Sequence, residues 1–152
     1  MNTGKRANRA GEQLADFVDN LLQDYGYVKV SQTRFFALCS LEQPIYAKEC
    51  FAGKTLYGGP RRVDFILYHP FKWKDCLVIE CKWQARSGSV DQKYPYFVES
   101  INENPQPAII VLDGAGHSRR SDQWLKDQAG KKKLLHVMNQ GEIALFASNK
   151  KL

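Results

Sequence analysis

The sequence predicts a single α/β domain in which a central mixed β-sheet is flanked by helices. Its 152 residues lie within the range of about 100–200 that is usual for one domain. The hydrophobic share of 43% and the aromatic share of 12% exclude a wholly disordered chain. Strand-like and helix-like stretches alternate along the second half, which requires helices packed on a sheet. We expect residues 1–10 to form a basic N-terminal segment that could be flexible, and residues 11–152 to form the domain.

The first half predicts one helix followed by strands. Over residues 11–25, apolar residues recur at the i, i+3, i+4, i+7 spacing of an amphipathic helix, and Gly26 supplies its C-terminal stop. Short β-like pieces follow at residues 27–30, 34–38 and 45–51. A Gly-Gly-Pro turn precedes two apolar stretches at residues 63–68 and 76–83, which we interpret as consecutive strands.

The second half predicts alternating helices and strands. Ser89 and Gln92 have the spacing of a capping box, and the helical stripe behind them contains Pro95. Because proline suits a first turn, the regular helix should begin at Tyr94 or Pro95. Residues 108–112 form an apolar run typical of a strand buried on both faces. Beyond it we expect a helix over 121–129, a strand over 134–138 and a short helix over 141–148.

Composition and charge narrow the functional classes. The net charge of +6 suits a polyanionic partner, although a merely basic surface would give the same balance. No apolar run approaches the roughly 20 residues of a membrane span. The N-terminal residues lack the apolar stretch of a secretory signal, so we expect a cytoplasmic protein without membrane association. The four cysteines have no metal-ligand spacing and should be reduced core residues.

Three charged residues stand inside the apolar strands. Asp64 lies in Val-Asp-Phe-Ile-Leu, and Glu80 and Lys82 share one face of the next strand. If the two strands are neighbours, Asp64 can lie near Glu80, and two converging carboxylates suit a hard cation such as Mg²⁺. Lys82 could then position water or stabilise charge on a phosphate. The structural alternative is a carboxylate–lysine salt bridge at a sheet edge.

Asp64, followed sixteen residues later by Glu80-Cys81-Lys82, resembles the motif of the PD-(D/E)XK nuclease superfamily. This is the restriction-endonuclease-like fold, shared with archaeal Holliday-junction resolvases. The resemblance implies that Asp64, Glu80 and the backbone carbonyl of Cys81 bind the metal, and that Lys82 acts on the water. Val63 stands where the family's name has proline.

Further candidate residues surround this motif. Gln84 extends it as a further catalytic candidate. Many members of the family carry a glutamate on the first helix that assists the metal site, and Glu12 resembles it. Glu12 could equally be a first-turn acid favoured by the helix dipole. Candidates for phosphate contacts are Arg61, Arg62, Lys93, Ser87 and Ser89.

The predicted function is Mg²⁺-dependent hydrolysis of phosphodiester bonds, with Mn²⁺ expected to substitute. The expected partner is DNA, duplex or branched, cut by a restriction-type or structure-selective endonuclease. Cutting a duplex favours a homodimer, because twofold symmetry lets each protomer cut one strand. Residues 113–117 lack the GxGxxG spacing, so no nucleotide cofactor is expected. Two alternatives remain: a non-catalytic nucleic-acid-binding module on the same fold, and a structural protein whose charged strand residues form salt bridges.

Overall fold

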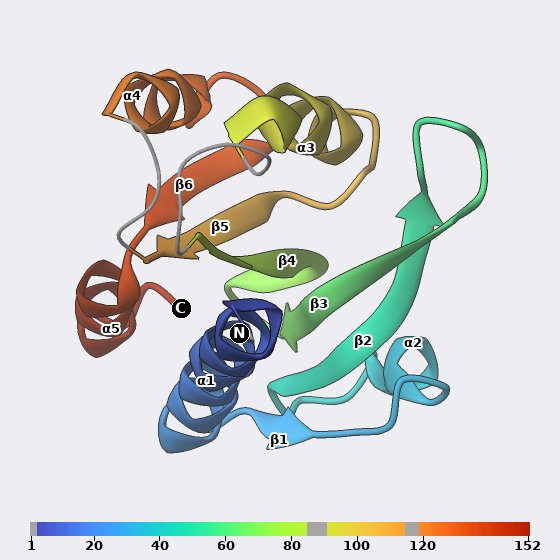
Figure 1. Ribbon diagram of the computed structural model, residues 1–152. Helices are drawn as coiled ribbons and strands as arrows, with labels where there is room; N and C mark the ends of the chain where they lie inside the picture. The colour runs from blue at the N-terminus through green and yellow to red at the C-terminus, as the bar shows by residue number, and fades with distance from the viewer. Residues whose placement is uncertain (1–2, 85–90, 115–118) are drawn as a thin grey trace.

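A six-stranded sheet forms the centre of the computed structural model, which describes residues 3–84, 91–114 and 119–152 (Figure 1). The strand order follows the chain. The strands are β1 (Val28–Lys29), β2 (Ile45–Lys54), β3 (Pro60–His69), β4 (Trp73–Trp83), β5 (Ala108–Asp113) and β6 (Leu134–Met138). β2, β3 and β4 pair antiparallel, whereas β1 pairs parallel with β2, and β4, β5 and β6 pair parallel. The mixed sheet confirms the predicted fold class.

Helices cover both faces of the sheet (Figure 1). The helical elements are α1 (Thr3–Asp24), α2 (Phe35–Leu38), the 3₁₀ turn η1 (Asp91–Lys93), α3 (Tyr94–Asn102), α4 (Arg119–Gln128) and α5 (Gln140–Ser148). One face packs against α1 and α5 through buried residues such as Leu14, Val18 and Ile143. The other face packs against α3 and α4 through Val98 and Leu125. The sheet is therefore buried on both sides, which explains its continuous apolar runs.

The first helix is longer than the hydrophobic pattern predicts. α1 begins at Thr3, so its helical backbone runs through most of residues 1–10, which we expected to form a basic N-terminal segment. Apolar periodicity detects only the part of a helix that faces the core, which begins near Leu14. The preceding turns contain lysine, arginine and alanine, which favour helix without producing an apolar stripe.

Residues 34–38 were predicted as a β-like piece, and that prediction is wrong. They contain the short helix α2, in which Leu38 N–H donates to the Arg34 carbonyl at 3.2 Å. Phe35 is fully buried while Phe36 is half exposed. One helical turn thus places a single aromatic ring in the core, and tertiary packing overrides the weak β-preference of so short a segment.

Elsewhere the predicted elements are confirmed with small shifts of their ends. α3 begins at Tyr94, with Pro95 in its first turn, and β6 has the predicted bounds. All four cysteines are free. Within the described residues, no helix combines the length and the apolar character needed to cross a membrane.

Gly114 joins the end of β5 to the end of β4 by a close backbone approach. Its φ is +108°, and a Cβ at this position would lie 2.2 Å from the Gln84 carbonyl oxygen. We expect Gly114→Ala to lower the free energy of unfolding by about 2 kcal/mol or more, because the variant combines backbone strain with a backbone clash. Urea denaturation would measure this loss.

Gly26→Ala is the matched control for that variant. Gly26 also has a positive φ, of +89°, but a Cβ there meets no heavy atom within 4 Å. It should therefore show only the cost of the strained backbone, about 1 kcal/mol. Equal losses at both positions would mean that the contact with Gln84 imposes no constraint.

Candidate active site

Adjacent positions on β3 and β4 bring two carboxylates together. Phe65 lies opposite Ile79 in the antiparallel pair, and the same register continued by one residue places Asp64 opposite Glu80. The Asp64 Oδ2 also accepts a hydrogen bond of 2.8 Å from the Cys81 backbone N–H. The structure therefore brings together the acidic pair that the sequence singled out.

The surroundings of Glu80 disfavour the charged form of its carboxyl group. Its side chain is only 12% exposed. Burial, and next the neighbouring Asp64, raise the pKa of Glu80 to about 8, although Lys82 and Arg61 oppose the shift. A carboxyl group with such a pKa holds its proton at neutral pH. A proton or a metal cation relieves the electrostatic repulsion between two neighbouring carboxyl groups.

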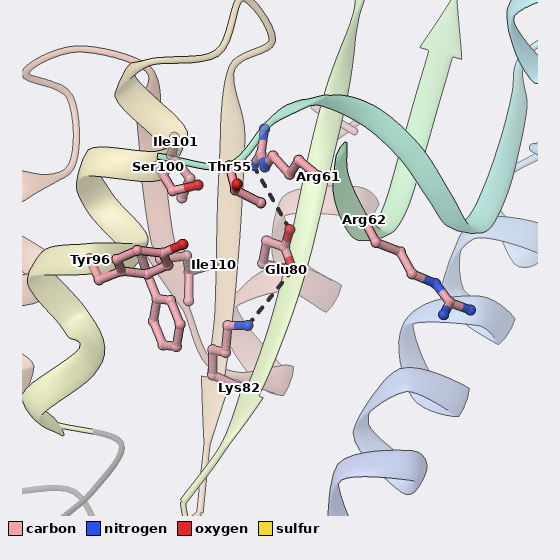
Figure 2. A pocket seen from close by; sticks show the side chains of 10 residues that line it. Thr55, Arg61, Arg62, Glu80, Lys82, Tyr96, Ser100, Ile101 and Ile110 are labelled. Atoms are coloured by element: carbon pink, nitrogen blue, oxygen red, sulfur yellow. Dashed lines mark ion pairs between the residues drawn. The ribbon is translucent and has the colours of Figure 1, made fainter. Parts of the chain in front are cut away.

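Two cations flank Glu80 on the α3 side of the sheet. The Lys82 Nζ lies 3.8 Å from one carboxylate oxygen, and the Arg61 Nη2 lies 3.9 Å from the other (Figure 2). The Lys82 ammonium also sits 4.4 Å from the centre of the Phe97 ring. Both ion pairs are longer than a good hydrogen bond, so neither cation is held tightly by Glu80.

A pocket of about 180 Å³ opens between these residues and α3 (Figure 2). It is lined by Thr55, Arg61, Arg62, Glu80, Lys82, Tyr96, Phe97, Ser100, Ile101 and Ile110. The side chain of Arg62 points away from Glu80 and Lys82 (Figure 2), and its Nε pairs with Glu49 at 2.9 Å. Of the two arginines expected to contact phosphate, Arg61 therefore faces the acidic pair.

A second pocket, of about 260 Å³, adjoins Asp64 on the α1 side. Its lining includes Glu12 and Cys81, so the structure brings Glu12 to the same pocket as Asp64. Lys48 and Glu49 also line it. Sequence reasoning missed these two residues. Like Asp64, they are charged residues inside a predicted apolar strand, here the one over residues 45–51.

The remaining candidates lie apart from the two pockets or outside the described residues. Gln84 is buried at the end of β4, where its backbone N–H donates to the Asp113 carbonyl at 3.0 Å. It is absent from the described linings of both pockets. Lys93 is exposed in η1, just before α3, whereas its sequence position placed it on the apolar stripe. Ser87 and Ser89 lie outside the described residues.

The donor set fits a hard divalent cation. Asp64, Glu80 and the Cys81 backbone carbonyl would supply oxygen ligands, and burial and the neighbouring Asp64 already disfavour a negative charge on Glu80 unless a cation offsets it. The described part of the chain contains no group of three His, Cys, Asp or Glu side chains placed to hold a metal ion. Mg²⁺ in proteins often uses one or two carboxylates and completes its shell with water and substrate phosphate.

A family model described as a PD-(D/E)XK nuclease superfamily domain matches residues 6–150. The chain belongs to the PD-(D/E)XK nuclease superfamily. The match covers the acidic pair, Lys82 and every strand of the sheet, so it confirms the resemblance found in the sequence motif. No curated protein and no solved structure matches the chain. Membership of the superfamily supports a nuclease type of function and a nucleic acid as partner.

Proposed function

We propose that the protein is a Mg²⁺-dependent endonuclease that hydrolyses phosphodiester bonds of DNA. The observation that carries this proposal is the partly buried Asp64–Glu80 pair with Lys82 beside it on the same strand face as Glu80. A salt-bridge network would not need two carboxylates in mutual contact, because their repulsion costs free energy unless a cation or proton relieves it.

Each residue of the site has a chemical role in this proposal. Asp64, Glu80 and the Cys81 carbonyl would hold the metal, with Glu12 adding a carboxylate from α1. When bound, Mg²⁺ supplies Lewis-acid stabilisation of charge on the phosphate, and Mn²⁺ should substitute for it. Lys82 orients the attacking water and stabilises negative charge that develops on the phosphate oxygens. For a duplex substrate we propose a homodimer, in which each protomer cuts one strand.

A cleavage panel tests the proposal. Supercoiled plasmid, linear duplex, single strand, four-way junction and RNA would be incubated with Mg²⁺, with Mn²⁺ and with a chelator. We expect cutting of a DNA substrate only with metal, and Asp64→Ala should abolish it because one of the two acidic ligands is lost. Asp16→Ala removes an exposed acid from α1 and should cut like the unaltered protein.

Other outcomes of the panel would change the assignment. Metal-independent binding without cutting of any substrate would favour the non-catalytic nucleic-acid-binding module. Cutting of RNA alone would support the proposed phosphodiester hydrolysis but would make RNA, not DNA, the substrate. Equal activity of Asp64→Ala and the unaltered protein would contradict the proposed site.

A further inference from the structure

The pocket on the α3 side combines a buried cation with exposed aromatic rings. Its walls come from the turn between β2 and β3, which carries Thr55 and Tyr57, and from α3, which carries Tyr96 and Ser100. Arg61 reaches into the same space from the start of β3 (Figure 2). The proposed metal chemistry uses neither the turn nor the aromatic rings.

Arg61 is only 5% exposed, yet part of its hydrogen-bonding capacity is not used. Its Nη1 has no hydrogen-bond partner among the described residues, and its Nη2 lies 3.9 Å from Glu80. A buried nitrogen of a guanidinium group without a hydrogen-bond partner is costly. The complement of a planar guanidinium is an anion that accepts two hydrogen bonds at once, such as a phosphate.

The surroundings of Arg61 suit a phosphate group. Thr55 and Ser100 place hydroxyl groups on the pocket wall, and each hydroxyl can donate a hydrogen bond to a phosphate oxygen. The volume of about 180 Å³ is far above the roughly 10–15 Å³ that a cavity needs to hold one water, so the pocket has room for one phosphate group.

Two tyrosines extend this pocket outward as a stacking surface. Tyr57 is 91% exposed and Tyr96 is 39% exposed. Their ring centres lie 6.4 Å apart with an interplanar angle of 30°. Exposed aromatic faces stack nucleic-acid bases of any sequence. In a duplex the neighbouring base pairs cover both faces of each base, so only an unpaired base can use this surface.

Asn104 ties the turn to α3. It is buried, its Oδ1 accepts from the Lys54 N–H at 2.9 Å, and its Nδ2 donates to the Lys54 and Ser100 carbonyls at 2.9 and 2.7 Å. Gly53 allows this approach, because a Cβ there would lie 1.9 Å from the Asn104 Oδ1. The two walls of the pocket are thus pre-organised relative to each other.

We infer that this pocket binds an unpaired nucleotide beside the cleaved bond. Arg61, with the hydroxyl groups of Thr55 and Ser100, takes its phosphate, and Tyr57 and Tyr96 stack its base. The inference rests on the proposed function and specifies its substrate class: DNA that carries unpaired nucleotides at the cutting site.

Binding without cleavage tests this inference. A fluorescein-labelled twelve-nucleotide DNA of mixed sequence would be titrated in chelator at fixed salt, as a single strand and annealed to its complement. We expect the single strand to bind about 10-fold more tightly than the duplex, because one stacked base contributes a factor of this order. Tyr57→Ala should lose about 10-fold in affinity for the single strand, whereas Tyr57→Phe should retain it.

Two further variants make the test specific. Phe71→Ala removes a similarly exposed ring, 82% exposed, from the turn between β3 and β4 at the other end of the sheet, and it should bind like the unaltered protein. Arg61→Met should lower the affinity and reduce the slope of log K against log salt by about one. If Arg61→Met does not fold, the tyrosine variants decide the question.

The outcomes separate this site from the proposed function. Equal affinity for both DNA forms, an unchanged Tyr57→Ala variant, or an equal loss in Phe71→Ala would overturn the inference, even if metal-dependent cutting is observed. A preference for single strands that depends on Tyr57 would support the site, even if no substrate in the panel is cut.

Discussion

Glu80→Gln is expected to abolish cleavage and, at the same time, to stabilise the metal-free protein. The amide removes a carboxylate that we propose as a metal ligand, so we expect the activity to fall at least about 1,000-fold. It also removes the repulsion between Glu80 and Asp64, which with burial raises the pKa of Glu80. Thermal unfolding in chelator, together with the cleavage panel, would measure both effects.

The sign of the stability change follows from the pKa of Glu80. That pKa is about 8 in the folded protein, against an ordinary value of 4.5. Between these two values the folded protein binds more protons than the unfolded chain, so stability falls as pH rises through this window. Glutamine does not ionise. The gain of the variant should therefore grow from pH 5 to pH 8 and reach roughly 1–3 kcal/mol.

In saturating Mn²⁺ the unaltered protein should be more stable than Glu80→Gln, because a cation that binds only the folded state stabilises the unaltered protein and not the variant. Destabilisation of Glu80→Gln in chelator at pH 8 would mean that Glu80 mainly anchors a structural salt bridge. That result would favour a structural protein in which the charged strand residues form only salt bridges.

Lys82→Ala is expected to reduce cleavage by about 10²–10⁴-fold while leaving the fold nearly intact. Its ammonium is partly exposed and lies 3.8 Å from Glu80, a geometry that contributes little to stability. The variant also loses the contact between the ammonium group and the Phe97 ring, so we expect the free energy of unfolding to fall by about 1 kcal/mol. Single-turnover cleavage and urea denaturation would separate the two effects.

Lys74→Ala is the matched control for this variant, since Lys74 is an exposed lysine near the other end of β4. It should retain full activity. If Lys82 were only a structural partner of Glu80, Lys82→Ala would lower stability clearly, because it would leave a buried carboxylate without its partner. A folded and fully active Lys82→Ala variant would exclude Lys82 from the chemistry.

The acidic pair and its lysine were predictable from the sequence because charge inside an apolar strand is costly. Asp64, Glu80 and Lys82 stand out against Val, Ile and Leu neighbours without any knowledge of the fold. Asp64 and Glu80 also meet through a local register between two strands adjacent in the chain. Lys48 and Glu49 are likewise charged residues within the preceding apolar strand, which pairs with β3, but they have no place in the family motif.

The aromatic and hydroxyl residues of the pocket could not be predicted in the same way. Tyr57 and Tyr96 are separated by the whole of β3 and β4, and their positions alone are typical of a turn residue and a helix residue. Their proximity depends on Asn104, which joins α3 to the turn through backbone groups that have no sequence pattern. Arg61 likewise looks like a surface arginine in the sequence, whereas the structure buries it beside Glu80.

By itself, the sequence determined the α/β class, most of the strands and helices, and the three charged residues at the centre of the site. Hydrophobic periodicity and the cost of burying charge act over neighbouring residues, so a linear pattern records them. Only the tertiary structure decided the length of α1, the helical turn of α2, the pairing of Glu80 with Arg61, and the pocket lined by Thr55, Tyr96 and Ser100. These features depend on contacts between segments distant in the chain, and the periodicity of neighbouring residues does not predict such contacts.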